Sequence, residues 1–298
     1  MISTTHHHQC PLCGSKELKP YLTATDRMAT GEKFHIVQCR HCGFLFTQDA
    51  PPPSMIGRYY GTPDYRPHGL GGGITSMLYR LVRKMMLRWK SQLIHRYHHL
   101  RGRIIDVGAG TGEFLAYMRR CGWDVGGCEQ SEMAREYARK RHDLVLDGDV
   151  MQAVYTSSCA DVITAWHAIE HIDNLPELCG SLYRWLKPEG LLVIAVPNAN
   201  SFDSEYYGEQ WAAWDVPRHL WHFSFETMNK LANAQGFRLI ACHALPLDAC
   251  YICLLSGKNK FLALVNGVKF ALKGVFVPQK ASSLIYVFRK AQDEHKSV

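Results

Sequence analysis

The sequence of 298 residues contains no apolar run long enough to cross a lipid bilayer. Its longest apolar stretches, at 191–196 and 261–265, fall well short of the roughly 20 residues that a transmembrane helix needs. The N-terminal segment also lacks the apolar core of a secretory signal peptide. From these two absences we expect a cytoplasmic protein without a transmembrane segment.

The sequence also lacks a large excess of charge of one sign. Its 34 Lys and Arg residues against 27 Asp and Glu residues give a net charge of +7. Such a modest positive charge is compatible with an anionic small molecule, an RNA or an acidic membrane surface, and it selects none of them. The hydrophobic share of 47 % is ordinary for a folded protein, so we do not expect a disordered chain.

Two pairs of cysteines near the N-terminus follow a metal-ligand spacing. Cys10 and Cys13 lie in "CPLCG", and Cys39 and Cys42 lie in "CRHCG". Each pair sits on a tight turn that the following glycine permits, and four thiolates from two such turns make a tetrahedral zinc site. Four reduced, buried cysteines would give no reason for this paired spacing. We therefore predict structural Zn²⁺ in a small zinc-ribbon-like module at residues 1–50, with two short strands flanking the second pair.

Residues 51–100 are interpreted as a linker followed by an amphipathic helix. Three consecutive prolines begin the segment, and a loop rich in tyrosine and glycine follows them. From residue 74 to residue 100, apolar residues recur at helical spacing with basic residues between them. Such a helix can bind a membrane or a partner groove, but we expect it to pack on the domain that follows.

From residue 101 onward, apolar segments alternate with helical ones. This pattern predicts an α/β domain at residues 101–298, with a mostly parallel seven-stranded sheet covered by helices on both faces. The expected strands are 103–110, 124–130, 143–150, 160–166, 190–198, 237–245 and 282–290. Two insertions, at 199–223 and 246–281, interrupt the alternation on the side where a substrate would bind.

The first predicted strand runs into a glycine-rich turn, "IIDVGAGTGEF". Gly108, Gly110 and Gly112 form a G-x-G-x-G pattern, whereas dinucleotide-binding folds use G-x-G-x-x-G. The third glycine of that pattern would fall on Glu113. A carboxylate there would repel a pyrophosphate at the positive end of the helix, which argues against NAD.

The turn, together with Glu129, Gly148–Asp149, "ADVITAWHAIEHI" and "RWLKPEGLLVIAVPN", resembles the class I S-adenosylmethionine-dependent methyltransferases. The resemblance covers roughly residues 101–245 and implies a Rossmann-like fold with S-adenosyl-L-methionine as methyl donor. It further implies a donor site made of Asp106, Gly108, Ala109, Gly110, Glu129, Gln130, Asp149, Val150, Trp166 and His167.

The resemblance gives these donor-site residues physical roles. The glycines let the backbone approach the methionine part of the donor, and Asp106 supplies negative charge near its ammonium group. Glu129 would accept hydrogen bonds from both ribose hydroxyls, and Asp149 from the adenine amine. His167, together with the preceding tryptophan, would line the sulfonium and the methyl group.

Transfer of a methyl group to a hydroxyl or an amine requires alignment and the removal of a proton, and histidine is the natural base near neutral pH. His171, His219 and His222 are the candidates, because they lie after strands whose ends meet at one sheet edge. The alternative is that the latter two only tie the loop to the helix that Ser224 begins. Glu170 and His171 also resemble part of the Glu-x-x-Glu-His stretch that binds a divalent metal in ubiquinone-pathway O-methyltransferases.

The favoured function is methyl transfer to a small molecule, with a sugar or lipid intermediate as acceptor. The layout is similar to that of sugar methyltransferases with an N-terminal zinc module. The alternatives are a zinc-module methyltransferase of ribosomal RNA and a non-catalytic donor-binding protein. The chain lacks the Asn/Asp-Pro-Pro-aromatic tetrad of base-methylating enzymes, which disfavours a nucleic-acid acceptor. The insertion at 246–281 could form a lid, a dimer contact or a peripheral membrane patch, and the oligomeric state stays open.

Overall fold

The computed structural model describes residues 5–60, 74–245 and 247–291. Its central sheet has the strand order β5-β4-β6-β7-β10-β9. The strands are β4 Arg103–Val107, β5 Asp124–Cys128, β6 Ala160–Trp166, β7 Leu186–Pro197, β9 Phe237–Ala244 and β10 Ser283–Lys290. Strands β5, β4, β6 and β7 are parallel, and β10 runs antiparallel to both of its neighbours.

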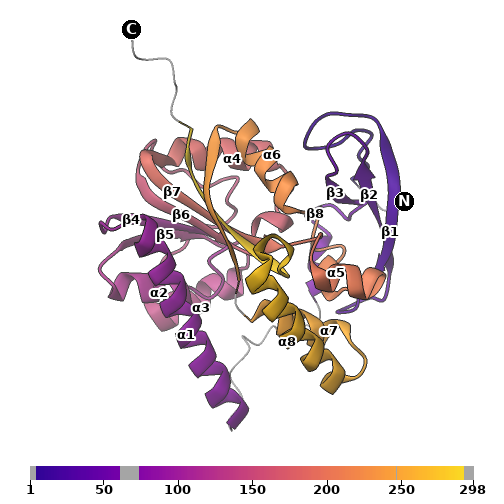
Figure 1. Ribbon diagram of the computed structural model, residues 1–298. Helices are drawn as coiled ribbons and strands as arrows, with labels where there is room; N and C mark the ends of the chain where they lie inside the picture. The colour runs from indigo at the N-terminus through magenta and orange to yellow at the C-terminus, as the bar shows by residue number, and fades with distance from the viewer. Residues whose placement is uncertain (1–4, 61–73, 246, 292–298) are drawn as a thin grey trace.

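Helices cover both faces of this sheet, as Figure 1 shows. They are α1 Ile74–Tyr97, α2 Glu113–Arg120, α3 Glu132–His142, α4 Leu175–Trp185 and α6 Phe225–Ala234. Helices α1, α2 and α3 pack on the face that carries Ile285 and Val287, while α4 and α6 pack on the face of Tyr286 and Phe288. Because both faces are buried, the strands are apolar along most of their length. The predicted Rossmann-like α/β fold is confirmed.

One predicted strand is wrong. Within the described residues the central sheet has six strands, because segment 143–150 contributes only an isolated parallel bridge between Asp147 and Cys128. Aspartate and glycine make up half of this segment, and both are disfavoured in strands. Asp143 also adopts the left-handed conformation at the end of α3, and the Val145 side chain faces solvent. The segment therefore crosses the sheet edge instead of extending it.

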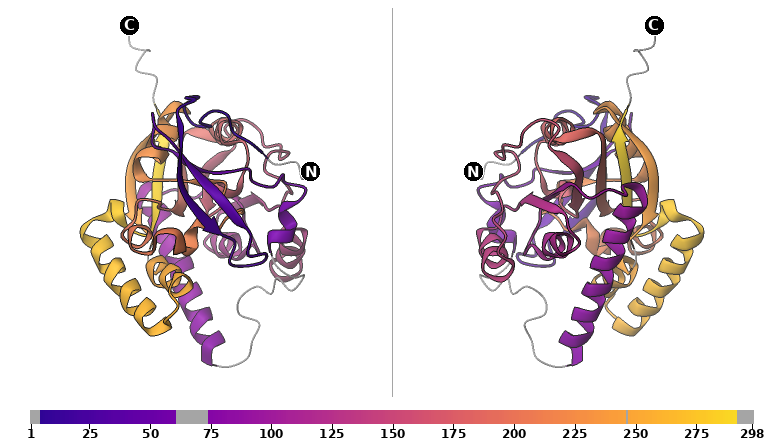
Figure 2. Two further views of the ribbon diagram at one scale, coloured as in Figure 1. Left: turned by 90° about the vertical axis from the view of Figure 1, so that its right-hand side faces the viewer. Right: turned by 90° about the vertical axis from the view of Figure 1, so that its left-hand side faces the viewer.

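The N-terminal segment forms an antiparallel sheet of its own with the order β1-β2-β3-β8. Its strands are β1 Leu18–Thr25, β2 Lys33–Cys39, β3 Leu45–Gln48 and β8 Trp221–His222. The two strands expected around the second cysteine pair are therefore present as β2 and β3. The last strand comes from the insertion at 199–223, and Phe44 packs against its Trp221. The predicted module thus shares a sheet and a core cluster with the domain that follows (Figure 2, left).

Helix α1 packs on the domain through its C-terminal half, as expected. Leu93 and Ile94 are buried there, whereas Leu81 and Met85 of the same apolar stripe are exposed. The side chains of Met77 and Leu78 lie outside the described residues. The right-hand view of Figure 2 shows the N-terminal half of α1 extending beyond the sheet. Among the described helices, none is both long and apolar enough to span a bilayer.

The two insertions form helices at one end of the sheet. The first contains α5 Phe202–Tyr207. The second contains α7 Asp248–Ser256 and α8 Lys260–Phe276, which pack against each other as a hairpin (Figure 1). The hairpin also contacts α5, so both insertions cover the same side of the domain.

Candidate active site

A cavity of about 250 Å³ opens at the carboxyl ends of the parallel strands. Ligands bind at this edge in open α/β sheets because the connecting loops diverge there. Six of the ten predicted donor-site residues line the cavity: Gly108, Glu129, Gln130, Asp149, Val150 and His167. Asp106, Ala109, Gly110 and Trp166 are not among its lining residues, but each lies within two residues of one in the chain.

The glycine-rich turn brings backbone close to the cavity. Gly108 has a φ of 71°, and a Cβ added to it would lie 2.6 Å from the Cβ of Ala168. The amides of Gly108 and Ala109 donate to the carbonyl of Cys128, which ties the turn to the end of β5. At Gly110 no atom of the described residues, its chain neighbours aside, lies within 4 Å of an added Cβ. The turn is therefore packed on one side and open on the other, as a cradle for a ligand requires.

Glu129 follows β5 and points back to the turn. One carboxylate oxygen accepts from the Gly110 amide at 2.8 Å, and the other accepts from the Ser131 amide at 2.8 Å. Two backbone donors thus fix the side chain, while each oxygen keeps a lone pair for a further donor. A carboxylate held in this way suits a diol.

Asp106, at the end of β4, is buried and accepts a hydrogen bond of 2.5 Å from the Thr164 hydroxyl. Burial raises the pKa of Asp106 to about 7, because the carboxylate loses its hydration. Lys90 of α1 lies nearby, with its Nζ 4.2 Å from the ring centroid of Trp166. Burial lowers the pKa of Lys90, and the charges of Asp106 and Asp248 oppose that shift. The sequence pattern of α1 gave no sign that Lys90 would reach this site.

His167 follows β6 with a φ of 53°. Its Nε2 lies 3.2 Å from an Asp248 oxygen, and its Nδ1 lies 3.5 Å from a Glu170 oxygen. Burial lowers the pKa of His167, but the two carboxylates outweigh burial and raise it to about 10. The imidazole is therefore cationic at neutral pH, and it connects the cavity wall to the start of α7. Sequence reasoning missed Asp248 because it lies about 80 residues away.

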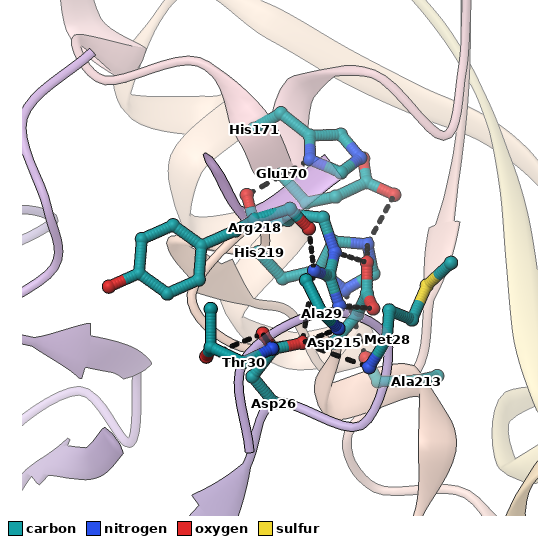
Figure 3. A network of polar contacts seen from close by, with 11 residues as sticks. Asp26, Met28, Ala29, Thr30, Glu170, His171, Ala213, Asp215, Arg218 and His219 are labelled. Atoms are coloured by element: carbon teal, nitrogen blue, oxygen red, sulfur yellow. Dashed lines mark hydrogen bonds and ion pairs between the residues drawn. The ribbon is translucent and has the colours of Figure 1, made fainter. Parts of the chain in front are cut away.

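His171 and His219 lie together beside Glu170, as Figure 3 shows. The ring centroids of the two histidines are 4.7 Å apart. The Nδ1 of His171 donates to the carbonyl of Arg218, and the Nδ1 of His219 donates to the carbonyl of Ala213, each at 2.9 Å. A carbonyl can only accept, so the Nδ1 of each ring carries a proton, and any lone pair that the ring keeps lies on Nε2.

The Glu170 carboxylate is buried, and neither oxygen has a hydrogen-bond partner among the described residues. One ligand atom from each of Glu170, His171 and His219 lies within 4.8 Å of the others. Burial lowers the pKa of His171 to about 4, so this ring is neutral at pH 7. Burial raises the pKa of Glu170, but the surrounding histidines outweigh it and hold the pKa below its usual value. His171 also lines the cavity.

The structure does not bring His222 to the cavity. Its ring is buried, with Nε2 3.0 Å from the Thr47 hydroxyl, and packs edge-on against Trp214. Burial lowers the pKa of His222 well below its ordinary value. The residue joins β8 to β3, whereas the alternative kept from the sequence was that it ties the loop to the helix that Ser224 begins.

The four N-terminal cysteines converge as their spacing predicts. Cys10 and Cys42 have their Sγ atoms 3.5 Å apart, and Cys13 and Cys39 have theirs 3.6 Å apart. All four sulfurs lie within 4.8 Å of one another. A tetrahedral zinc site with bonds of about 2.3 Å needs sulfur separations of about 3.8 Å, so these side chains fit the ion.

A family model described as a methyltransferase domain matches residues 80–241, which is more than half of the chain. The chain belongs to this family. The match begins inside α1 and ends inside β9, so it includes every predicted donor-site residue. The resemblance to class I methyltransferases is confirmed.

Curated relatives share the same region. A malonyl-[acyl-carrier protein] O-methyltransferase of Pectobacterium atrosepticum is 35 % identical over 94 residues, which cover 31 % of this chain and 37 % of that protein. A ubiquinone biosynthesis O-methyltransferase of Rhodopseudomonas palustris is 28 % identical over 149 residues, which cover 46 % of this chain and 58 % of that protein. The chain therefore spans less than two thirds of the length of these relatives.

Solved structures share the fold. A protein from Galdieria sulphuraria, described as a sarcosine dimethylglycine methyltransferase, has a TM-score of 0.54 at 15 % identity, covering 71 % of this chain and 88 % of that chain. A geranyl diphosphate C-methyltransferase from Streptomyces coelicolor has a TM-score of 0.50 at 13 % identity, covering 68 % and 76 %. At these identities the similarity shows the fold alone.

We predict that Glu129→Ala weakens binding of S-adenosylmethionine by about tenfold or more, because two charge-assisted hydrogen bonds to the ribose are lost. Isothermal titration calorimetry measures the change directly. Glu132→Ala, on the first turn of α3, is the matched control and should bind like the wild type. Equal affinity in Glu129→Ala and the wild type would refute the ribose assignment.

We predict that affinity for the donor rises as the pH rises from about 6 to about 8. Burial raises the pKa of Asp106 to about 7 in the free protein, and only the ionised carboxylate attracts an ammonium group. Protonation below pH 7 therefore competes with binding. Titrations across this range should show the rise in the wild type and a flat profile in Asp106→Asn. A rise that persists unchanged in the variant would assign it to another group.

Proposed function

We propose that this protein transfers a methyl group from S-adenosylmethionine to a small-molecule acceptor, a sugar or lipid intermediate, by in-line displacement. The observation that carries the proposal is the shared cavity. Donor-side residues such as Glu129 and Asp149 form one wall, while Ile56 of the linker and Leu220 of the first insertion form another. A donor bound against the first wall would present its methyl group to an acceptor bound against the second.

His171 is the residue that we propose as the general base. It lines the cavity, its ring is neutral at pH 7, and its Nδ1–H is held by a backbone carbonyl. Its Nε2 is therefore free to accept a proton. His219 would act beside it, and we assign His222 to packing instead of catalysis.

Zinc in the Cys10, Cys13, Cys39 and Cys42 site would be structural. The site offers four thiolates and no open position for a substrate, as in closed structural sites. Because Lys230 of α6 donates to the carbonyl of Cys42, this site also helps to seat the N-terminal sheet on the domain.

The character of the lining favours a small molecule over RNA. Glu129, Asp149 and Asp173 place three carboxylates in the cavity wall, and Arg218, which also lines it, is paired with buried acids. An RNA backbone requires the opposite charge at its binding surface.

We predict that purified protein moves tritium from labelled donor into a soluble or lipid fraction of a cell extract, and that RNA stays unlabelled. His171→Gln should lower kcat by about 10²- to 10⁴-fold, since that is the usual contribution of a general base, with donor affinity unchanged. His243→Gln, in a histidine of β9 outside the cavity, is the matched control. Label in RNA, or full turnover in His171→Gln, would contradict the respective assignment.

A second role for the same cluster is to hold a divalent metal ion. Among the described residues the buried Glu170 oxygens accept no hydrogen bond, although one of them lies 3.5 Å from His167 Nδ1 and 4.0 Å from His219 Nε2. Two imidazoles and one carboxylate favour a transition metal such as Zn²⁺ or Fe²⁺ over Mg²⁺. The resemblance to the metal-binding stretch of ubiquinone-pathway O-methyltransferases includes only Glu170 and His171. His219 would supply a third ligand. Such an ion would polarise an acceptor hydroxyl and assist its loss of a proton.

Metal content distinguishes the base from the metal site. If the cluster holds an ion, zinc-loaded wild-type protein should contain about two equivalents per chain, one in each site, and Glu170→Gln about one. Elemental analysis after dialysis measures this. His243→Gln should keep about two. One equivalent of zinc in all three proteins would show that the cluster holds no ion, and base catalysis would be its only proposed role.

A further inference from the structure

Helix α8 is apolar on two opposite faces. One face is buried against α7, α5 and the segment after α8, and its buried residues are Ala263, Asn266, Gly267, Phe270 and Gly274. At Gly267 an added Cβ would lie only 2.6 Å from the Cα of Cys250, so the backbones of α7 and α8 are in close contact. This contact fixes the rotation of α8, and the residues on its other face cannot turn inward.

The outer face carries a continuous stripe of large apolar side chains at helical spacing. Its members are Phe261, Leu264, Val265, Val268, Leu272, Val275 and Phe276. Phe261 is 79 % exposed and Phe276 is 84 % exposed. Helices that are apolar all round are normally buried, and large contiguous apolar surfaces on a protein mark interaction sites.

The charges around this stripe have one sign. Residues 249–292 contain no Asp or Glu. At 100° per residue, Lys269 and Lys273 lie along one edge of the stripe. Lys260, at the other edge, donates to the carbonyls of Leu254 and Gly257 at the end of α7. Lysines at the borders of an apolar helical face can extend their ammonium groups into a headgroup layer while their stems cover apolar surface.

We propose that the outer face of α8 docks the protein on an anionic lipid bilayer, with the stripe in the interface and Lys269 and Lys273 on the headgroups. This docking proposal does not depend on the proposed methyl transfer. A second copy of the chain is the weaker occupant, because a two-fold contact would bring the same lysine rows together. Helix α7 begins at Asp248, which pairs with His167 of the cavity wall. Docking would therefore place the bilayer on the side of the cavity where His167 lies.

Flotation of the full chain with vesicles tests the proposal. We expect the wild type to bind vesicles of equal phosphatidylcholine and phosphatidylglycerol about tenfold more than phosphatidylcholine alone, and to lose most of this preference in 0.5 M salt. Leu272→Asp with Phe276→Asp should reduce binding by about tenfold or more. Both side chains are exposed, so the fold should survive, as circular dichroism and thermal unfolding would show.

The matched control places two aspartates at exposed apolar positions elsewhere, Val145→Asp with Val154→Asp, and should bind like the wild type. Lys269→Glu with Lys273→Glu should lose the preference for anionic vesicles. Wild-type protein that stays with neither vesicle would overturn the proposal. A dimer in sedimentation, abolished by the α8 variant without any vesicle binding, would assign the face to a second copy.

Discussion

The arrangement of the site depends on the ion pairs and hydrogen bonds of the Arg218 guanidinium. The guanidinium is buried and pairs with Asp26 at 3.1 Å and with Asp215 at 2.6 Å (Figure 3). It also donates to the carbonyl of Tyr59. A buried charge is stable only when it is paired and hydrogen-bonded. Arg218 therefore holds the N-terminal sheet, the linker and the first insertion in one arrangement. Because its carbonyl also accepts from His171, that arrangement fixes the orientation of the proposed base.

Features that depend on short stretches of sequence could be predicted. The turn at Gly108 needs a residue that tolerates positive φ and a close approach to Ala168, and its spacing was visible in the sequence. Glu129 bonds to Gly110, which follows β4, and to Ser131, which follows the neighbouring strand β5. The cysteine pairs and the cap at Ser224 are also local patterns. In each of these cases the relevant partners are placed by one turn or by one strand and its neighbour.

Features that depend on contacts between distant segments could not be predicted from the sequence. Lys90 reaches the site only because α1 crosses the end of the sheet, and Asp248 reaches His167 only because α7 folds back. Strand β8 has two residues, too few for any periodicity. His219 and His222 look equivalent in the sequence, yet β8 turns the second toward Thr47 and leaves the first beside Glu170. The sequence pattern cannot assign different positions to these two histidines, because the pairing of β8 with β3 determines where each side chain lies.

The charges that these distant segments bring together bear on the choice of ligand. Asp106, Glu129, Glu170 and Asp248 place four carboxylates around the proposed donor side, together with the basic side chains of Lys90 and His167. A sulfonium donor carries one positive charge more than its demethylated product, and a low-dielectric site amplifies that difference. An excess of carboxylates therefore favours the donor over the product that would otherwise compete for the same turn. The pKa of Asp106, near 7, places part of this preference within the physiological range, because protonation would remove one of the four charges.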